Sequence, residues 1–251
     1  MNDVVTAIAV FVCLCTASIA MMLLYPRLSA RHRDDETNTV LRLVANIFVV
    51  MTSLVFGLLI NSSKNTFETI DSKVHAYATS LIMFDRALRT YGTETVETRR
   101  RLVQYIERAI VDPARSDDAF AHHTSPAANA LDQVGGALDR IAPSDRYHEG
   151  LLADARQQYQ SVVHQRWSIV EQAEASVPRL VIWMLMAWMT LIYGSFGYRA
   201  PHNPMVVGMF VVSATLIAIS VYFVMDMSVP FHGPIQVSDA PLRRALAEIQ
   251  P

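Results

Sequence analysis

Four long apolar windows without a charged residue recur along the chain. A helix of about 20 residues crosses the roughly 30 Å hydrocarbon core of a bilayer, and in lipid only helices and closed barrels satisfy every backbone group. The windows lack the alternating pattern of barrel strands, so we predict four transmembrane helices. The residues before the first window include Asp3 but no Lys or Arg, whereas a signal peptide begins with basic residues. We therefore expect the first window to be a retained span. The windows are Val4–Tyr25, Leu43–Ser63, Leu180–Tyr198 and Pro204–Met225.

The segment between the second and third windows has a different pattern. Apolar residues recur there at steps of three and four among polar ones, which is typical of amphipathic helices. The steps from Val74 to Leu88 predict that the helix of the second span continues to about Tyr91. Proline-containing breaks separate three further predicted helices, over about 94–111, 127–141 and 145–178.

These patterns predict an all-α integral membrane protein with four transmembrane helices and an extramembrane helical bundle between the second and third. The expected parts are a first helix pair in 1–63, the bundle in 64–177, a second pair in 178–225 and a tail in 226–251. The tail ends in a short amphipathic helix, which we expect to lie on the membrane or on a neighbouring subunit. Its apolar stripe is Leu242, Ala245, Leu246 and Ile249.

Composition agrees with a membrane protein. Of the 251 residues, 52% are hydrophobic and 18% are charged, against about 25% charged residues in soluble domains. With 21 Lys and Arg and 23 Asp and Glu, the formal net charge is -2. This balance argues against the basic face of a nucleic-acid-binding protein. The lipid bilayer is therefore the expected partner, and nucleic acid is not.

Basic residues in the short loops predict the orientation. Arg27, Arg31, Arg33 and Arg42 flank the connection between the first two windows, and Arg199 lies between the last two. Lys and Arg in short loops mark the cytoplasmic side. We therefore expect the N-terminus, the middle bundle and the C-terminus to be extracytoplasmic, in a multi-pass protein of the inner (plasma) membrane.

The second window carries polar and small residues on one helical face. Two explanations stay open. Small residues let helices approach closely and amides bond across them, whereas polar groups in a span also line water-filled paths. Past the window the same face continues with Glu68 and Asp71. The face consists of Asn46, Ser53, Gly57, Asn61 and Lys64.

Residues for catalysis, cofactor binding or metal binding form no recognisable pattern. Nucleophile-elbow, zincin and phosphate-loop motifs are absent from the sequence. His122 and His123 are adjacent, so they cannot easily reach one tetrahedral ion together. We expect no enzyme, no cofactor and no metal site.

Two stretches resemble a known family. One is the run Gly-Leu-Leu-Ile-Asn-Ser-Ser-Lys-Asn-Thr-Phe-Glu from Gly57 to Glu68. The other is the tail that holds Asp226, Pro230, Phe231 and Gly233, followed by Ile, Val, Ser and Pro-Leu. Both are similar to the bacterial bestrophin-like membrane proteins, as is the order of paired spans, helical middle, paired spans and tail. Here 227–229 separate the acid from the Pro-Phe pair, where a shorter acid-Arg-Pro-Phe sequence is usual.

The resemblance implies an anion channel assembled as a pentamer, with its helical bulk in the cytoplasm, on the opposite side from the charge-based expectation. The first hypothesis is therefore a homo-oligomeric ion channel of the bacterial inner membrane. In it Asn46, Ser53 and Asn61 would replace ion hydration, and Lys64 would favour anions. The alternative is a non-catalytic accessory or structural subunit that docks onto a larger membrane complex, where the same face packs helices.

Overall fold

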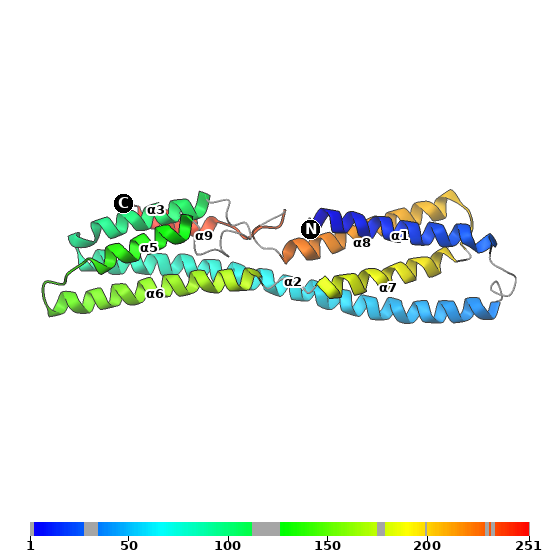
Figure 1. The fold of residues 1–251 in the computed structure, drawn as a ribbon, viewed down its shortest axis with the longest axis horizontal. Helices are drawn as coiled ribbons and strands as arrows, with labels where there is room; N and C mark the ends of the chain where they lie inside the picture. Colours follow the sequence, from blue (N-terminus) through cyan, green and yellow to red (C-terminus); the bar gives the residue numbers. More distant parts are fainter. Residues whose placement is uncertain are drawn as a thin grey trace. The chain divides into compact units, whose positions relative to one another are not determined.

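The computed structural model describes residues 3–27, 35–111, 126–174, 179–198, 200–228, 231 and 234–250. Within these ranges every regular element is helical (Figure 1). Four helices are long and apolar enough to cross a membrane, which confirms the four predicted apolar helices. In chain order the elements are α1 Asp3–Leu24, η1 Tyr25–Arg27, α2 Asp35–Tyr91, η3 Thr93–Thr95, α3 Val96–Val111, α5 Pro126–Asp139, α6 Arg146–Glu174, α7 Arg179–Gly197, α8 Pro204–Met227 and α9 Ala240–Ile249.

The helices belong to two compact units. Unit 1 consists of Met1–Asn65 and Val177–Ser228, and unit 2 of Thr66–Ser176 and Val229–Pro251. Unit 1 therefore holds α1, α7 and α8, and unit 2 holds α3, α5, α6 and α9. Helix α2 is one continuous element of 57 residues that contributes to both.

The end of α2 has a local cause in the sequence. No glycine or proline interrupts the chain between Lys64 and Tyr91, so the helix continues past the apolar window. It stops at Gly92, whose φ of 117° is in a region that side chains disfavour. The Thr95 hydroxyl then donates to the carbonyl oxygen of Leu88 at 2.7 Å, and so satisfies an orphan carbonyl of the last turn. The predicted end near Tyr91 is confirmed.

Close approach of helices organises unit 1. Helix α1 packs against α7 and α8, and its side chains Val10 and Leu14 are buried in an apolar core. A Cβ atom on Gly197 would overlap the backbone of Ser18, so α7 can approach α1 this closely only through a glycine. The small Ala218 is likewise buried in α8.

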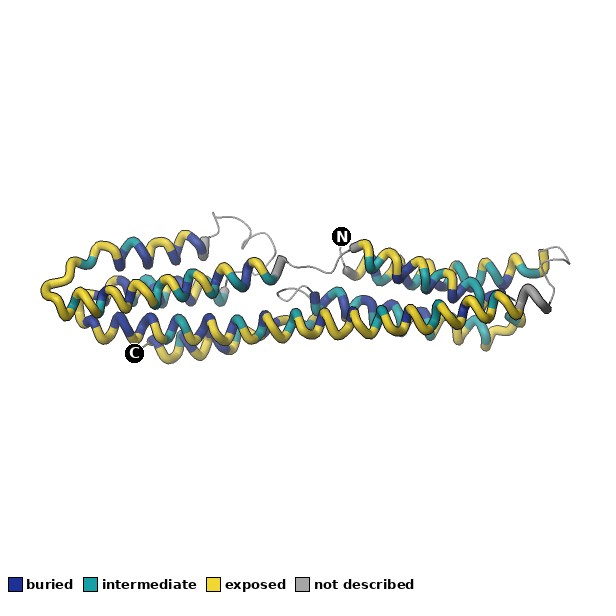
Figure 2. The backbone as a smooth tube through the Cα atoms, turned by 90° about the horizontal axis from the view of Figure 1, so that it is seen from below, coloured by how far each residue is buried: buried dark blue, intermediate teal, exposed yellow. Residues whose placement is uncertain are grey.

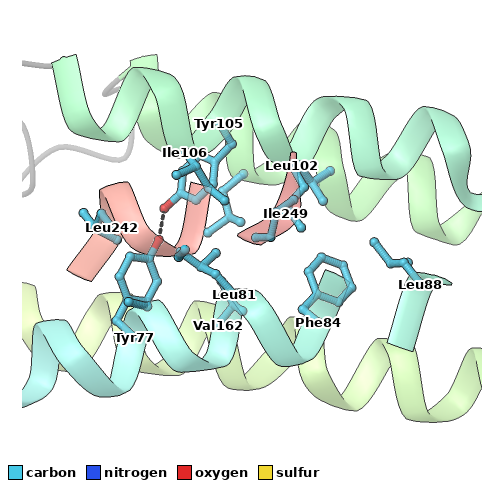
Figure 3. Close-up of a cluster of buried hydrophobic side chains, with 14 of the residues drawn as sticks. Tyr77, Leu81, Phe84, Leu88, Leu102, Tyr105, Ile106, Val162, Leu242 and Ile249 are labelled. Atoms are coloured by element: carbon cyan, nitrogen blue, oxygen red, sulfur yellow. Dashed lines mark hydrogen bonds between the residues drawn. The ribbon is translucent and has the colours of Figure 1, made fainter. Parts of the chain in front are cut away.

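Unit 2 has a core of larger side chains. Figure 3 shows Phe84 of α2, Leu102 of α3, Val162 of α6 and Ile249 of α9 pointing into one cluster, and all four are fully buried. The hydroxyls of Tyr77 and Tyr105 hydrogen-bond each other inside this cluster. Pairing the two hydroxyls removes the cost of burying either one alone.

The C-terminal helix α9 differs from the sequence-based expectation. Leu242, Ala245 and Ile249 are buried in the core of unit 2, and α9 packs against α3. The expectation that this amphipathic helix lies on the membrane or on a neighbouring subunit is therefore wrong. The apolar stripe was identified correctly, but its partner is the helical unit of the same chain.

Candidate functional site

The predicted polar face of α2 is exposed throughout unit 1. Asn46, Ser53, Gly57, Asn61 and Lys64 all lie on the surface of the chain. Exposed residues recur along this part of α2 in Figure 2. The helix brings the five residues onto one side, as their spacing predicts.

The packing face of α2 is a different one. Ala45, Thr52, Leu59 and Ser63 are buried. At 100° per residue they lie roughly 120° around the helix axis from the polar face. Among the described residues, the buried hydroxyls of Thr52 and Ser63 have no hydrogen-bond partner. The amino-acid sequence did not single out these two residues, because a Ser or Thr hydroxyl in a helix commonly donates to a carbonyl oxygen of the preceding turn.

Two residues of the polar face show that close packing within the chain does not explain it. A Cβ atom on Gly57 would meet no described atom within 4 Å, so no neighbouring helix makes use of this glycine. The Ser53 hydroxyl donates to the carbonyl oxygen of Val49 at 2.8 Å and is thus satisfied within α2. The face is therefore available to water, lipid or another chain.

Two grooves in unit 1 border one part of the polar face and not the rest. The first, of about 460 Å³, is lined by Arg42 and Asn46 together with residues of α7 and α8. The second, of about 410 Å³, is lined by Ser53 together with the same two helices. Gly57, Asn61 and Lys64 line neither groove. Sequence spacing placed all five residues on one face but could not show that its first part borders α7 and α8.

The two described residues of the tail motif belong to different units. Asp226 lies near the end of α8 and is buried in unit 1, whereas Phe231 packs against the core of unit 2. Pro230 and Gly233 lie outside the described residues. His122 and His123 also lie outside them, and the described residues contain no group of three His, Cys, Asp or Glu that could hold a metal ion.

A buried charge in unit 2 was missed by the sequence analysis. The Asp85 carboxylate is buried and accepts hydrogen bonds from Nε of Arg89 at 2.6 Å and of Arg99 at 2.7 Å. Arg89 also donates to the carbonyl oxygen of Ile249 at 2.9 Å, so the cluster joins α2 and α3 to the end of α9. The spacing of Asp85 and Arg89 is visible in the sequence, but the contribution of Arg99 is not.

The buried Tyr105 and the half-buried Tyr159 of unit 2 hold their phenols in the neutral form. Burial raises the pKa of Tyr105. Burial, reinforced by the negative charges of Asp132 and Asp139, raises the pKa of Tyr159 to about 12. The Tyr159 hydroxyl donates to the carbonyl oxygen of Leu131 at 3.2 Å. These groups therefore act as hydrogen-bond donors that fix helices.

The four apolar helices define the class: this is a multi-pass α-helical membrane protein. The model of the bestrophin-like domain matches residues 12–242, so the chain belongs to the bestrophin-like family. It is similar to two crystal structures of point-mutated forms of a bacterial bestrophin homologue from Klebsiella pneumoniae. One has a TM-score of 0.65 at 11% identity and covers 97% of both chains. The other has a TM-score of 0.61 at 12% identity and covers 96% of this chain and 97% of that one. Among curated proteins none matches.

Proposed function

We propose that the protein is a homo-oligomeric ion channel and that the polar face of α2 lines its axis. The supporting observation is that this face stays exposed on the single chain, in a helix apolar enough to span a membrane. Polar groups within a span rarely face lipid; they face a bundle interior or a water-filled cavity. Several copies arranged around α2 would provide that cavity.

Each residue of the face has a role in this proposal. The Asn46 and Asn61 amides and the Ser53 hydroxyl replace part of the hydration shell of a passing ion. Lys64 contributes positive charge at one end of the apolar segment and so favours anions. Glu68 and Asp71 follow Lys64 along the same face, and Glu68 is exposed; they reduce that preference. The proposal assigns no catalytic step to any residue.

The proposal places the two helix pairs of 1–63 and 178–225 in the bilayer, with the 64–177 segment and the tail outside it. Helix α2 has 57 residues, which corresponds to a length of about 85 Å, far more than the roughly 30 Å hydrocarbon core. The surface of unit 2 carries ion pairs such as Glu97 with Arg100, which favour water over lipid. Unit 2 is therefore the part that suits an aqueous compartment.

Two arguments about the orientation of the protein in the membrane lead to opposite results. The short-loop Lys and Arg count favours extracytoplasmic termini and an extracytoplasmic helical bundle, whereas the family resemblance implies a cytoplasmic one. A phosphatase reporter fused after Gln250 separates them, because it is active only outside the cytoplasm. An active fusion supports the charge-based orientation, and an inactive but stable fusion supports the family's. The channel proposal holds in either case.

Ion flux into liposomes tests the proposal directly. We expect the reconstituted protein to conduct, Asn61→Leu to lower the flux, and Lys64→Ala to shift selectivity from anions towards cations. Thr215→Leu and Arg108→Ala are matched controls, because they remove an exposed hydroxyl of α8 and an exposed cation of α3. No flux from well-folded protein, or equal effects of the test and control variants, contradicts the proposal.

A large side chain at Gly57 tests assembly. The space around Gly57 is open within the chain, so Gly57→Leu should leave the protomer folded and disturb only contacts between chains. We expect a lower oligomer mass by light scattering. Gly208→Leu is the control, because Gly208 of α8 is equally open. An unchanged homo-oligomer would contradict a close approach of chains at Gly57. A monomer that conducts nothing would instead favour the accessory-subunit hypothesis.

A further inference from the structure

The two grooves of unit 1 adjoin each other. Both are lined by Phe196 of α7 and Phe210 of α8, so they form one recess with two ends. On α2 the recess extends from Arg42 to Ser53, which corresponds to roughly 16 Å along the helix. The two ends differ in chemistry.

The first end is polar. Arg42, Asn46 and Ser195 line it, together with the residues that connect α7 to α8. Arg42 is exposed, and among the side chains that the structure describes none forms an ion pair or hydrogen bond with it. The nearby pair of Tyr198 with Tyr25, whose ring centroids lie 5.0 Å apart edge to face, is of the kind found at membrane–water interfaces.

The second end is apolar. Met189, Ile192, Met209 and Ile217 line it along with the two shared phenylalanines. The Ser213 hydroxyl also borders it, but it donates to the carbonyl oxygen of Met209 at 2.8 Å and so presents little polarity. Methionine side chains adapt to irregular apolar ligands.

We propose that this recess binds an anionic phospholipid, with the phosphate at Arg42 and an acyl chain between α7 and α8. A guanidinium matches a phosphate through paired, charge-assisted hydrogen bonds. The division of the recess into a cationic end and an apolar end matches an amphiphile. A free inorganic anion would use only the first end. The recess borders Asn46 and Ser53 of the polar face, so a lipid bound there would narrow the proposed axis beside these two residues. Lipid retention itself is measured without conduction.

Lipid retention by the purified protein tests the proposal. The full-length protein in detergent is titrated with phosphatidylglycerol or phosphatidylcholine, and the bound lipid is counted by native mass spectrometry. We expect preferential retention of phosphatidylglycerol and about tenfold weaker retention by Arg42→Gln, the effect of losing a charged hydrogen bond. Lys64→Gln, which removes an exposed cation outside both grooves, should retain the lipid as before.

A second variant tests the acyl end without changing charge. Ser213→Phe fills the apolar groove and should reduce retention of both lipids, whereas Thr215→Phe, on an exposed position of α8 outside both grooves, should not. Equal retention of the two lipids by the wild type, or unchanged phosphatidylglycerol retention by Arg42→Gln, overturns the proposal. The proposal is also overturned if the wild type retains no lipid and Ser213→Phe changes the oligomer mass. In that case a second copy of the chain fills the recess.

Discussion

The two units of this chain follow opposite surface rules. In unit 1, large apolar side chains point outward, as with Leu54 at 65% exposure and Leu180 at 78%. In unit 2 they gather in a core, and ion pairs such as Glu97 with Arg101 lie outside. Lipid imposes no penalty on apolar surface, whereas water does. An exposed leucine in unit 1 therefore carries little information. The informative residues are the exposed polar ones of unit 1 and the buried polar ones of unit 2.

The largest expected effect concerns helix approach in unit 1. Gly197→Ala places a methyl group onto the Ser18 backbone, which cannot rotate away as a side chain can. We expect a loss of about 3 kcal/mol or more in stability, or no folded protein. Thermal unfolding in detergent measures it. Gly194→Ala on the same helix has open space and should lose no stability. Similar stability of both variants would show that α1 and α7 do not approach through Gly197.

The next effect concerns the buried charge of unit 2. Asp85→Asn removes the negative charge and one of the two carboxylate oxygens that accept from Arg89 and Arg99. We expect a loss of about 2 kcal/mol, less than for a fully buried pair because Arg89 is 45% exposed. The hydrogen bond from Arg89 to the end of α9 should weaken too. Limited proteolysis should therefore release the C-terminus earlier. Unchanged protection of the C-terminus would mean that apolar packing alone holds α9.

A glycine in unit 2 provides the counterpart to Gly197. At Gly135 an added Cβ meets the ring of Tyr159, a side chain that can move, rather than backbone. Gly135→Ala gains about 1 kcal/mol in helix propensity but displaces the ring and its hydrogen bond to Leu131, so we expect a net loss of about 1 kcal/mol. Chemical denaturation measures it, with Gly136→Ala as the unobstructed control. A loss as large as that of Gly197→Ala would contradict the distinction.

The smallest effect is a pH dependence on the surface of unit 2. Hydrogen bonds from Arg101 and Arg100 lower the pKa of Glu97 below its ordinary 4.5. A lowered pKa in the folded state means that the stabilisation is present above pH 4.5 and disappears as the pH falls through the folded-state pKa. The difference in thermal midpoint between wild type and Glu97→Gln should therefore shrink in acid. Glu171→Gln, at an exposed acid of α6, is the control for removing one surface carboxylate.

Much of the fold was predictable because the signals are local. A charge-free window of about 20 residues has few alternatives to a membrane helix, and the four apolar helices were identified from this alone. The end of α2 at Tyr91 followed from Gly92, and the steps of three and four along Val74 to Leu88 identified the side of α2 that is buried in unit 2. The family followed from two short runs of residues at the second span and the tail.

The sequence by itself therefore determined which segments are helical, which of them suit lipid, and which residues share a face, because these depend on side chains one to four positions apart. Only the tertiary structure decided what each face contacts. It placed α9 in the core of unit 2, brought Arg99 to Asp85, and set Asn46 beside α7 and α8 while leaving the space around Gly57 open. Such contacts join residues far apart in the chain, and they depend on volumes and close approaches that helical periodicity does not encode.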